Sequence, residues 1–168
     1  MKIHIIGCSG SGKTYLAKAL SRKYNIPHFD LDDIQWDNNA QEYGVKMPPD
    51  KRNALLREIL GNSEWIIEGV YYKWVQQSFD EADKIYVLDM PRYLYTTRII
   101  IRSVKRKLGI QKGKKETLKS VCDLLKWTET FQHKNLQEIK KILDKYGDKV
   151  VWLSGKKDVQ EIIMAGIL

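Results

Sequence analysis

The 168-residue chain contains only two cysteines, three histidines and four prolines. Two cysteines, Cys8 and Cys122, are too few for a disulfide framework or a transition-metal cluster, and they fit a reducing compartment. No apolar run approaches the roughly 18–20 residues that cross a bilayer, and the apolar run near the N-terminus is too short for a signal-peptide core. We therefore expect a cytoplasmic globular protein, not a secreted, membrane-spanning or metal-cluster protein.

Acidic residues are scarce in one part of the chain. Residues 92–119 contain ten basic residues and a single acid, Glu116, so this basic segment alone has a formal charge of +9, while the whole chain has +8. A basic excess gathered in one place is typical of a chain that binds a polyanion, such as nucleotide phosphates, nucleic acid or anionic lipid. A solvated helix face is the alternative interpretation.

Short apolar runs alternate with longer segments of helical periodicity, and no linker or repeat divides them. We expect strands at 3–6, 26–29, 65–67, 84–88 and 150–153, with helices at 14–24, about 49–60, 91–108, about 115–146 with a break near 133–135, and 158–165. Leu94, Ile101, Val104 and Leu108 form the apolar stripe of the 91–108 helix. Continuously apolar strands that alternate with helices predict one α/β domain, with a parallel sheet covered by helices on both faces.

Residues 7–14, Gly-Cys-Ser-Gly-Ser-Gly-Lys-Thr, match the phosphate-loop pattern G-x-x-x-x-G-K-S/T between a predicted strand and a predicted helix. In such a loop the glycines let successive backbone N–H groups turn toward phosphate oxygens, and the helix dipole adds positive potential. Lys13 is placed to neutralise the β- and γ-phosphates, and Thr14 to offer its hydroxyl to Mg²⁺. The sequence predicts a nucleoside triphosphate site.

A magnesium ion in this site needs a carboxylate on a neighbouring strand. Glu68 and Asp89 each close a predicted strand. Their spacing alone leaves both residues open as the carboxylate beside the metal.

Taken together, the motifs resemble those of the small P-loop kinases related to adenylate kinase, and most of all the group called DNA topology modulation proteins (FlaR-related). The resemblance covers most of the chain and rests on residues 7–14, 31–36, 65–71 and 82–92 and on the basic helix with Arg98 and Arg102. It implies a three-layer α/β/α P-loop NTPase fold with a five-stranded parallel sheet. Within a single domain, 1–168, it implies a core at 1–91 and 146–168, a basic lid region at about 98–120 and an acceptor-covering segment at about 32–62.

The resemblance also implies roles for individual residues. The acid that closes the third strand lies beside the phosphate loop in these kinases, which favours Glu68 over Asp89 as the carboxylate beside Mg²⁺. Arg98 and Arg102 match a pair of lid arginines, of which one contacts adenine and one the phosphates. Asp32 is the candidate base if the acceptor is a hydroxyl. The expected ATP-binding residues are Gly7, Ser9, Gly10, Ser11, Gly12, Lys13, Thr14, Tyr15, Arg98, Gly155 and Lys156; the expected catalytic residues are Lys13, Asp32, Arg98 and Arg102; and the expected metal ligands are Thr14 and Glu68.

The chain departs from nucleoside monophosphate kinases at 30–36 and 70–73, where it lacks the arginines that grip an acceptor phosphate. We therefore expect an ATP-dependent phosphotransferase that acts on a small hydroxyl-bearing or nucleotide-like acceptor, as a monomer or homodimer with no membrane partner. Two alternatives stay open. One is a nucleic-acid-associated ATPase that uses residues 92–119 for DNA topology modulation, and the other is a non-catalytic nucleotide-binding regulatory module.

Overall fold

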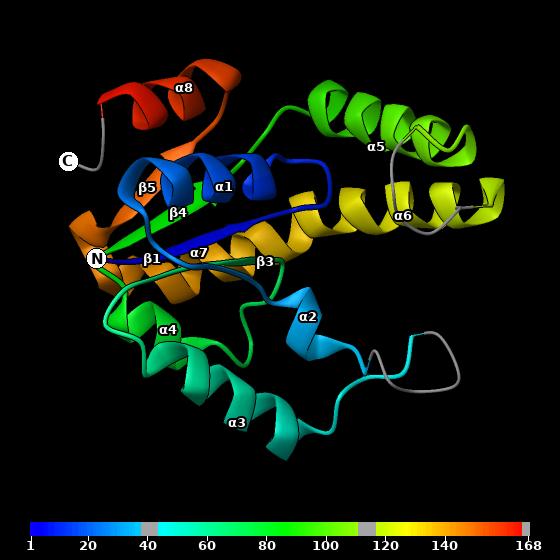
Figure 1. Cartoon of the computed structure of the whole chain (residues 1–168). Helices are drawn as coiled ribbons and strands as arrows, with labels where there is room; N and C mark the ends of the chain where they lie inside the picture. The colour runs from blue at the N-terminus through cyan, green and yellow to red at the C-terminus, as the bar shows by residue number, and fades with distance from the viewer. Residues whose placement is uncertain (38–43, 111–116, 166–168) are drawn as a thin grey trace.

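Five parallel strands form one sheet in the order β2-β3-β1-β4-β5 (Figure 1). The structure, a computed structural model, describes residues 1–37, 44–110 and 117–165. The strands are β1 (Lys2–Gly7), β2 (His28–Asp30), β3 (Trp65–Gly69), β4 (Lys84–Leu88) and β5 (Val150–Leu153). The helices are α1 (Lys13–Tyr24), α2 (Asp32–Gln35), α3 (Pro49–Leu60), α4 (Gln76–Glu81), α5 (Arg92–Lys107), α6 (Leu118–Thr130), α7 (Leu136–Leu143) and α8 (Lys156–Ala165), with a π-helical turn at Phe131–Asn135 and a 3₁₀ segment at Asp144–Lys149.

Two hydrophobic clusters lie on opposite faces of the sheet. Because successive strand residues point to opposite faces, Ile3 and Ile5 of β1 join one cluster and Ile6 joins the other. The first cluster continues into α1 and α8, and the second into α3, α4, α5 and α7. Figure 1 shows α1 and α8 on one side of the sheet and α3 and α4 on the other. This arrangement confirms the predicted α/β fold with helices on both faces of a parallel sheet.

The strand register brings four strand ends together at one edge of the sheet. Asp30 of β2 pairs with Glu68 of β3, and Gly7 of β1 pairs with Leu88 of β4. In an open parallel sheet, ligands bind outside the carboxyl ends of the strands. The segment after Gly7 and the side chain of Glu68 are therefore at the edge where a ligand site is expected.

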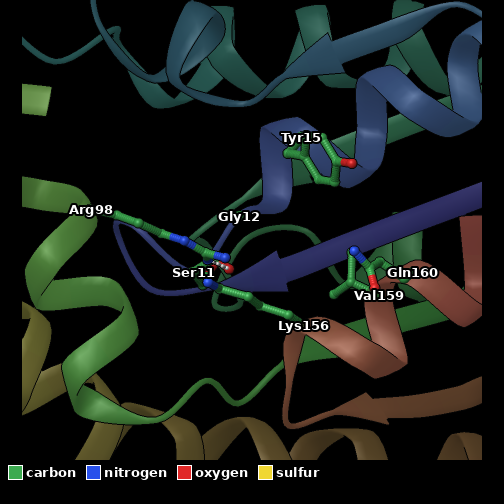
Figure 2. Close-up of a pocket in the computed structure, with 7 residues that line it drawn as sticks. All are labelled: Ser11, Gly12, Tyr15, Arg98, Lys156, Val159 and Gln160. Carbon is green, nitrogen blue, oxygen red and sulfur yellow. Dashed lines mark hydrogen bonds between the residues drawn. The ribbon is translucent and has the colours of Figure 1, made fainter. Parts of the chain in front are cut away.

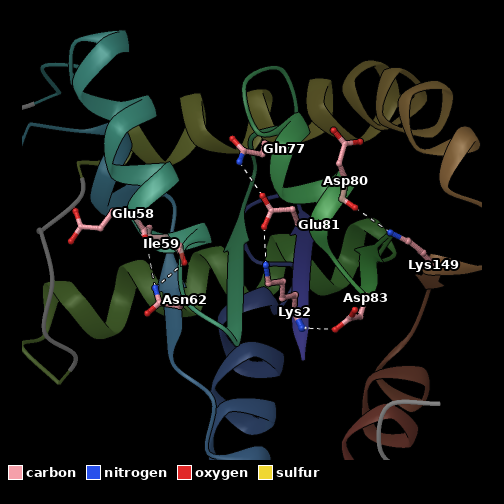
Figure 3. Close-up of polar contacts among 9 residues, drawn as sticks. All are labelled: Lys2, Glu58, Ile59, Asn62, Gln77, Asp80, Glu81, Asp83 and Lys149. Carbon is pink, nitrogen blue, oxygen red and sulfur yellow. Dashed lines mark hydrogen bonds and ion pairs between the residues drawn. The ribbon is translucent and has the colours of Figure 1, made fainter.

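Polar contacts tie the opposite edge of the sheet together (Figure 3). The backbone N–H of Lys2 donates to the carboxylate of Asp83 at 2.8 Å, and the Lys2 ammonium donates to Glu81 at 2.8 Å. Across the same edge, Lys149 donates to the backbone carbonyl of Asp80 at 3.2 Å. These contacts fix the start of β1 against α4 and β4, and α4 against the segment that leads into β5.

Three details differ from the sequence-based prediction. The short helices α2 and α4 were not predicted, because four and six residues are too few to show a helical period. The residues of the stripe predicted for α5 do share one side of the helix, but only Leu94 is buried: Ile101, Val104 and Leu108 are 47%, 50% and 67% exposed. The second half of α5 lies beyond the sheet, beside α6 (Figure 1), so no strand covers it.

The break predicted near 133–135 coincides with the π-helical turn Phe131–Asn135, which separates α6 from α7.

Within the described part of the chain, no helix is both long and apolar enough to span a membrane.

Candidate functional site

The phosphate loop joins β1 to α1 and depends on two glycines with a left-handed backbone. Gly10 has φ 77° and Gly12 has φ 106°, a region that residues with a Cβ rarely adopt. A Cβ at Gly10 would lie 2.7 Å from the carbonyl oxygen of Tyr95, and one at Gly12 would lie 3.1 Å from Nη1 of Arg98. The loop therefore needs glycine both for its curvature and for the close approach of α5.

Lys13 is the first residue of α1, and its side chain turns back over the loop. Its ammonium donates to the carbonyl oxygen of Cys8 at 3.0 Å. This places a positive charge at the mouth of the loop, beside the N-terminus of α1 and its unpaired N–H groups. The side chain and the helix terminus together favour a polyanion at this position.

Glu68 is buried at the end of β3 and contacts the first turn of α1. The hydroxyl of Thr14 donates to Oε1 of Glu68 at 2.5 Å, and Nε2 of His28 lies 3.7 Å from the same oxygen. Burial acts to raise the pKa of Glu68, but His28, Lys13 and Thr14 outweigh it and hold the pKa below its usual range. Glu68 is therefore a carboxylate at neutral pH.

The second candidate acid, Asp89, has a different partner. Its carboxylate accepts a hydrogen bond from Gln132 in the π-helical turn, and burial raises its pKa. Thr14 and Glu68 form an adjacent hydroxyl and carboxylate, the hard oxygen donors that Mg²⁺ prefers. No group of three or more histidine, cysteine or acidic side chains able to hold a metal occurs among the residues described. The Thr14–Glu68 pair could thus supply oxygen ligands to a magnesium ion, which would take its remaining ligands from phosphate and water.

Two arginines of α5 reach the phosphate loop from the side. Nη1 of Arg98 donates to the carbonyl oxygens of Gly10 and Ser11 at 3.1 and 2.6 Å. Nη2 of Arg102, one turn later, lies 3.4 Å from the hydroxyl oxygen of Ser9. The predicted four-residue spacing therefore does bring both guanidinium groups to the loop.

A pocket of about 390 Å³ lies beside the loop (Figure 2). It is lined by Ser11, Gly12, Tyr15, Arg98, Lys156, Val159 and Gln160. Tyr15, Arg98 and Lys156, which are far apart in the sequence, were all predicted to bind the nucleotide, and the structure brings them to this pocket. Gly155 lies just before α8, where its N–H donates to the carboxylate of Asp158 at 3.0 Å. The sequence analysis missed Val159 and Gln160, although both lie one helical turn after Lys156 and share its face.

Asp32 lies at the start of α2 on the other side of the loop, and it is exposed. Its carboxylate accepts a hydrogen bond from the hydroxyl of Tyr71 at 2.6 Å. Asp30 accepts from the backbone N–H of Asp32 at 2.9 Å. Burial, followed by the negative charge of Glu68, raises the pKa of Asp30 to about 6. The end of β2 therefore carries two neighbouring acids, Asp30 and Asp32, and the Tyr71 hydroxyl orients the carboxylate of Asp32.

An arginine that the sequence analysis did not identify lies on the aromatic ring next to Tyr71, the residue that donates to Asp32. The ring of Tyr71 is 5.2 Å from that of Trp74, and the guanidinium carbon of Arg52, on α3, lies 4.3 Å from the Trp74 ring centre. Arg52 also donates to the side-chain oxygen of Asn53 at 3.1 and 3.3 Å. Among the described residues, no carboxylate pairs with Arg52. The stretches 30–36 and 70–73 do lack arginine, as predicted, but α3 supplies one by tertiary packing.

Not every aromatic residue of this part of the sequence belongs to the site. The hydroxyl of Tyr72 donates to Glu138 of α7 at 2.7 Å, and Tyr72 is buried in the core. Tyr43 and the lid lysines Lys112, Lys114 and Lys115 lie outside the described residues.

Known proteins with sequence similarity to this chain include an adenylate kinase. No family model matches the chain. The uncharacterised protein YqaC of Bacillus subtilis (strain 168) is 29% identical over 105 residues, which is 62% of this chain and 57% of YqaC, so the match spans little more than half of that relative. An adenylate kinase of Clostridium kluyveri is 27% identical over an alignment of 176 residues, which covers 87% of this chain and 81% of the kinase. The fold is consistent with a P-loop NTPase, and the distant similarity supports an adenylate-kinase-like, nucleotide-binding P-loop family.

Proposed function

We propose that the chain is an ATP-dependent phosphotransferase that moves the γ-phosphoryl group of Mg-ATP to a small acceptor. One observation supports this most directly: the phosphate loop, two arginines of α5 and the Thr14–Glu68 pair meet at one edge of the sheet. The pocket at Tyr15 and Lys156 is continuous with the loop through Ser11 and Gly12, and its volume suits a nucleobase. A triphosphate would extend from this pocket along the loop.

Each group at the loop has a proposed task in phosphoryl transfer. The loop N–H groups and Lys13 would bind the β- and γ-phosphates. Arg98, which lines the pocket and also contacts the loop, would contact the nucleotide between its base and its phosphates. Arg102, beside Ser9, would stabilise the charge that develops on the transferred group. Thr14 and Glu68 would hold Mg²⁺, which neutralises charge on the phosphate oxygens. The basic lid region, about 98–120, and the acceptor-covering segment, about 32–62, would exclude water.

Asp32 is the proposed general base. As the acceptor oxygen bonds to the γ-phosphorus, its proton passes to the Asp32 carboxylate, the bond to the β–γ bridging oxygen breaks, and ADP leaves. The hydrogen bond from Tyr71 supports this role, because it fixes one carboxylate oxygen and leaves the other available. The exposed position of Asp32 leaves room for an acceptor.

Arg52 supports a finer proposal about the acceptor. Trp74 and Asn53 hold the guanidinium in place, and no carboxylate in the described parts of the chain neutralises it. Such a pre-oriented cation is suited to a carboxylate or phosphate. The guanidinium already covers one face of Trp74, so a base stacked on that face would have to displace it. We therefore propose an acceptor with a hydroxyl near Asp32 and an anionic group near Arg52.

An ATP-consumption screen tests this function. Purified protein with Mg-ATP is supplied with hydroxy acids, sugar phosphates, nucleosides and nucleoside monophosphates, and ADP release is measured. We expect turnover with an anionic hydroxyl compound, loss of turnover in Asp32→Asn, and a raised KM for that compound in Arg52→Ala. ATP binding without ADP release in the presence of any acceptor would instead favour a nucleotide-binding regulatory module.

The order of the motifs resembles that of the DNA topology modulation proteins, and this finer assignment also stays a proposal. Arg98 and Arg102 turn toward the loop, which leaves the exposed lysines 105, 107 and 119 as cations for DNA within the described part of the basic segment. Duplex affinity measured against salt concentration tests this alternative. A steep loss of affinity between low and moderate salt, with a shallower dependence on salt in Lys105→Ala, would support it.

A further inference from the structure

One face of α5 carries large apolar side chains that are exposed to solvent. Tyr93, Ile100, Ile101, Val104 and Leu108 are 68%, 45%, 47%, 50% and 67% exposed, respectively. At about 3.6 residues per turn, these positions fall on one side of the helix and form a continuous stripe. We call these five residues the α5 stripe. Contiguous apolar surface of this kind marks an interaction site more often than isolated exposed residues do.

The fold and the nucleotide site use the other faces of α5. Leu94, Tyr95 and Ile99 are buried against the body of the protein. Arg98 and Arg102 donate to the phosphate loop. A helix with these two tasks is expected to be polar on its remaining side. The α5 stripe is therefore accounted for neither by packing against the sheet nor by the contacts of α5 to the phosphate loop.

Positive charge borders the α5 stripe. Lys105 and Lys107 are exposed and fall on opposite sides of it at the helical spacing. Beyond the helix, Ile110 is 70% exposed, and at the start of α6 Leu118 is 81% exposed next to the exposed Lys119. Helix α5 contains no acidic residue. In the described part of the chain, this surface thus combines apolar side chains with lysines, and α5 itself supplies no acid to pair with them.

Three kinds of partner can be compared with this surface. A second copy of the same face would bring lysines against lysines, which is unfavourable. The phosphates of a nucleic acid would contact the lysines but would leave the side chains of Ile100, Ile101 and Val104 exposed to solvent. An anionic lipid surface satisfies both features, because lysines contact the headgroups and apolar side chains enter the boundary with the acyl chains. Such peripheral contact needs no membrane-spanning helix.

We propose that the α5 stripe, with Lys105 and Lys107, docks the protein peripherally on an anionic lipid surface. This proposal departs from the sequence-based expectation that the chain has no membrane partner. Arg98 and Arg102 donate to the phosphate loop and are not part of the α5 stripe, although Lys105 falls on their side of the helix. The contact is independent of which acceptor is phosphorylated.

Co-sedimentation of the full chain with lipid vesicles tests the proposal. One set of vesicles is phosphatidylcholine alone, and the other contains equal parts of phosphatidylcholine and phosphatidylglycerol. We expect binding to the anionic vesicles only, with affinity lowered roughly tenfold or more in the double variant Ile101→Ser/Val104→Ser and again in Lys105→Glu/Lys107→Glu. Matched controls on α8 are Met164→Ser, where the side chain is 82% exposed, and Lys157→Glu; these are expected to bind as the unmodified chain does.

Circular dichroism melting and Mg-ATP binding, measured on each variant, establish that the variants are folded. The proposal is overturned if the folded chain binds neither kind of vesicle, or if vesicle binding is the same in the α5 and α8 variants. It is also overturned if the Ile101→Ser/Val104→Ser change abolishes self-association, with no vesicle binding in the unmodified chain. Duplex DNA binding that depends on Lys105 and Lys107 but not on Ile101 and Val104, without vesicle binding, would assign the surface to nucleic acid instead.

Discussion

The hydroxyl of Thr14 and the carboxylate of Glu68 lie 2.5 Å apart, although 54 positions separate them in the chain. The pairing follows from the topology, since β3 lies beside β1 and both strands end at the same edge of the sheet. The hydrogen bond connects Thr14, which follows Lys13 at the end of the phosphate loop, to the buried and ionised carboxylate of Glu68. The same contact is the basis for the first prediction.

Replacing Glu68 with Gln keeps the size of the side chain but removes its charge. We expect the Mg²⁺ concentration needed for half-maximal ATP turnover to rise about tenfold or more, because a carboxylate that holds or orients the metal is lost. Asp89→Asn is the matched control, because Asp89 contacts Gln132 and not Thr14. A magnesium titration of both variants decides between the two acids. Equal shifts in both would contradict the assignment to Glu68.

Arg98 and Arg102 are predicted to act at different stages. Arg102→Ala is expected to lower kcat by about 10²-fold, the usual cost of removing a cation that stabilises the transition state. Arg98→Ala is expected to weaken ATP binding as well, because Arg98 lines the pocket and also donates to the loop. Steady-state kinetics and calorimetry with a non-hydrolysed ATP analogue separate the two effects. Lys126→Ala, which removes an exposed cation of α6 outside the lid region, is expected to change neither quantity, and an unchanged kcat in Arg102→Ala would refute its role.

Gly10→Ala is predicted to destabilise the fold and to disrupt nucleotide binding. The new Cβ would meet the Tyr95 carbonyl at 2.7 Å, and the backbone has φ 77°. Gly109→Ala provides a control for the backbone strain alone: Gly109 has φ 73°, but nothing lies within 4 Å of its Cβ position. Strain of this kind costs about 1–2 kcal/mol. We expect Gly10→Ala to cost more than Gly109→Ala in urea denaturation, and equal costs would show that α5 can move away.

The sequence predicted the phosphate loop and the strands well, because both are local patterns. Ile3, Ile5 and Ile6 form a run that only a strand buried on both faces would need, and the loop pattern fixes where α1 begins. The face of α5 that meets the core was not predictable in the same way. Periodicity shows which residues share a side of a helix, but not which side the rest of the chain covers, so Ile101 and Val104 were placed in a stripe whose exposure only the structure reveals.

Tertiary contacts explain the other omissions. Arg52 joins the site through Trp74, 22 positions later in the chain, and no spacing rule connects residues on α3 to the loop after β3. Val159 and Gln160 line the pocket because α8 packs against α1. Spacing alone also left Glu68 and Asp89 open, because the hydrogen-bond partner that distinguishes the two acids depends on the strand order and on the packing of the π-helical turn.

The raised pKa of Asp30 leads to a prediction about pH and stability. Because its pKa rises to about 6 on folding, the folded chain binds this proton more tightly than the unfolded chain does. Protonated Asp30 therefore favours folding at pH values below its unfolded pKa, and this contribution is lost as the pH rises through 6. Asp30→Asn keeps an acceptor oxygen for the Asp32 N–H but removes the partly buried charge. We expect it to stabilise the fold at pH 7.5 by about 1–2 kcal/mol.

Buried His4 makes the wild-type pH profile alone ambiguous. Burial lowers its pKa to about 3, so its contribution to stability falls as the pH drops from above 6.5 toward 3, opposite in sign to that of Asp30. The diagnostic quantity is therefore the difference between the unfolding free energies of the wild type and Asp30→Asn, measured by urea denaturation at several pH values. His4 contributes equally to both proteins and cancels. The difference should be small near pH 4, grow up to about pH 6 and then stay constant, and a difference that does not vary with pH would show that Asp30 is not perturbed by Glu68 and burial.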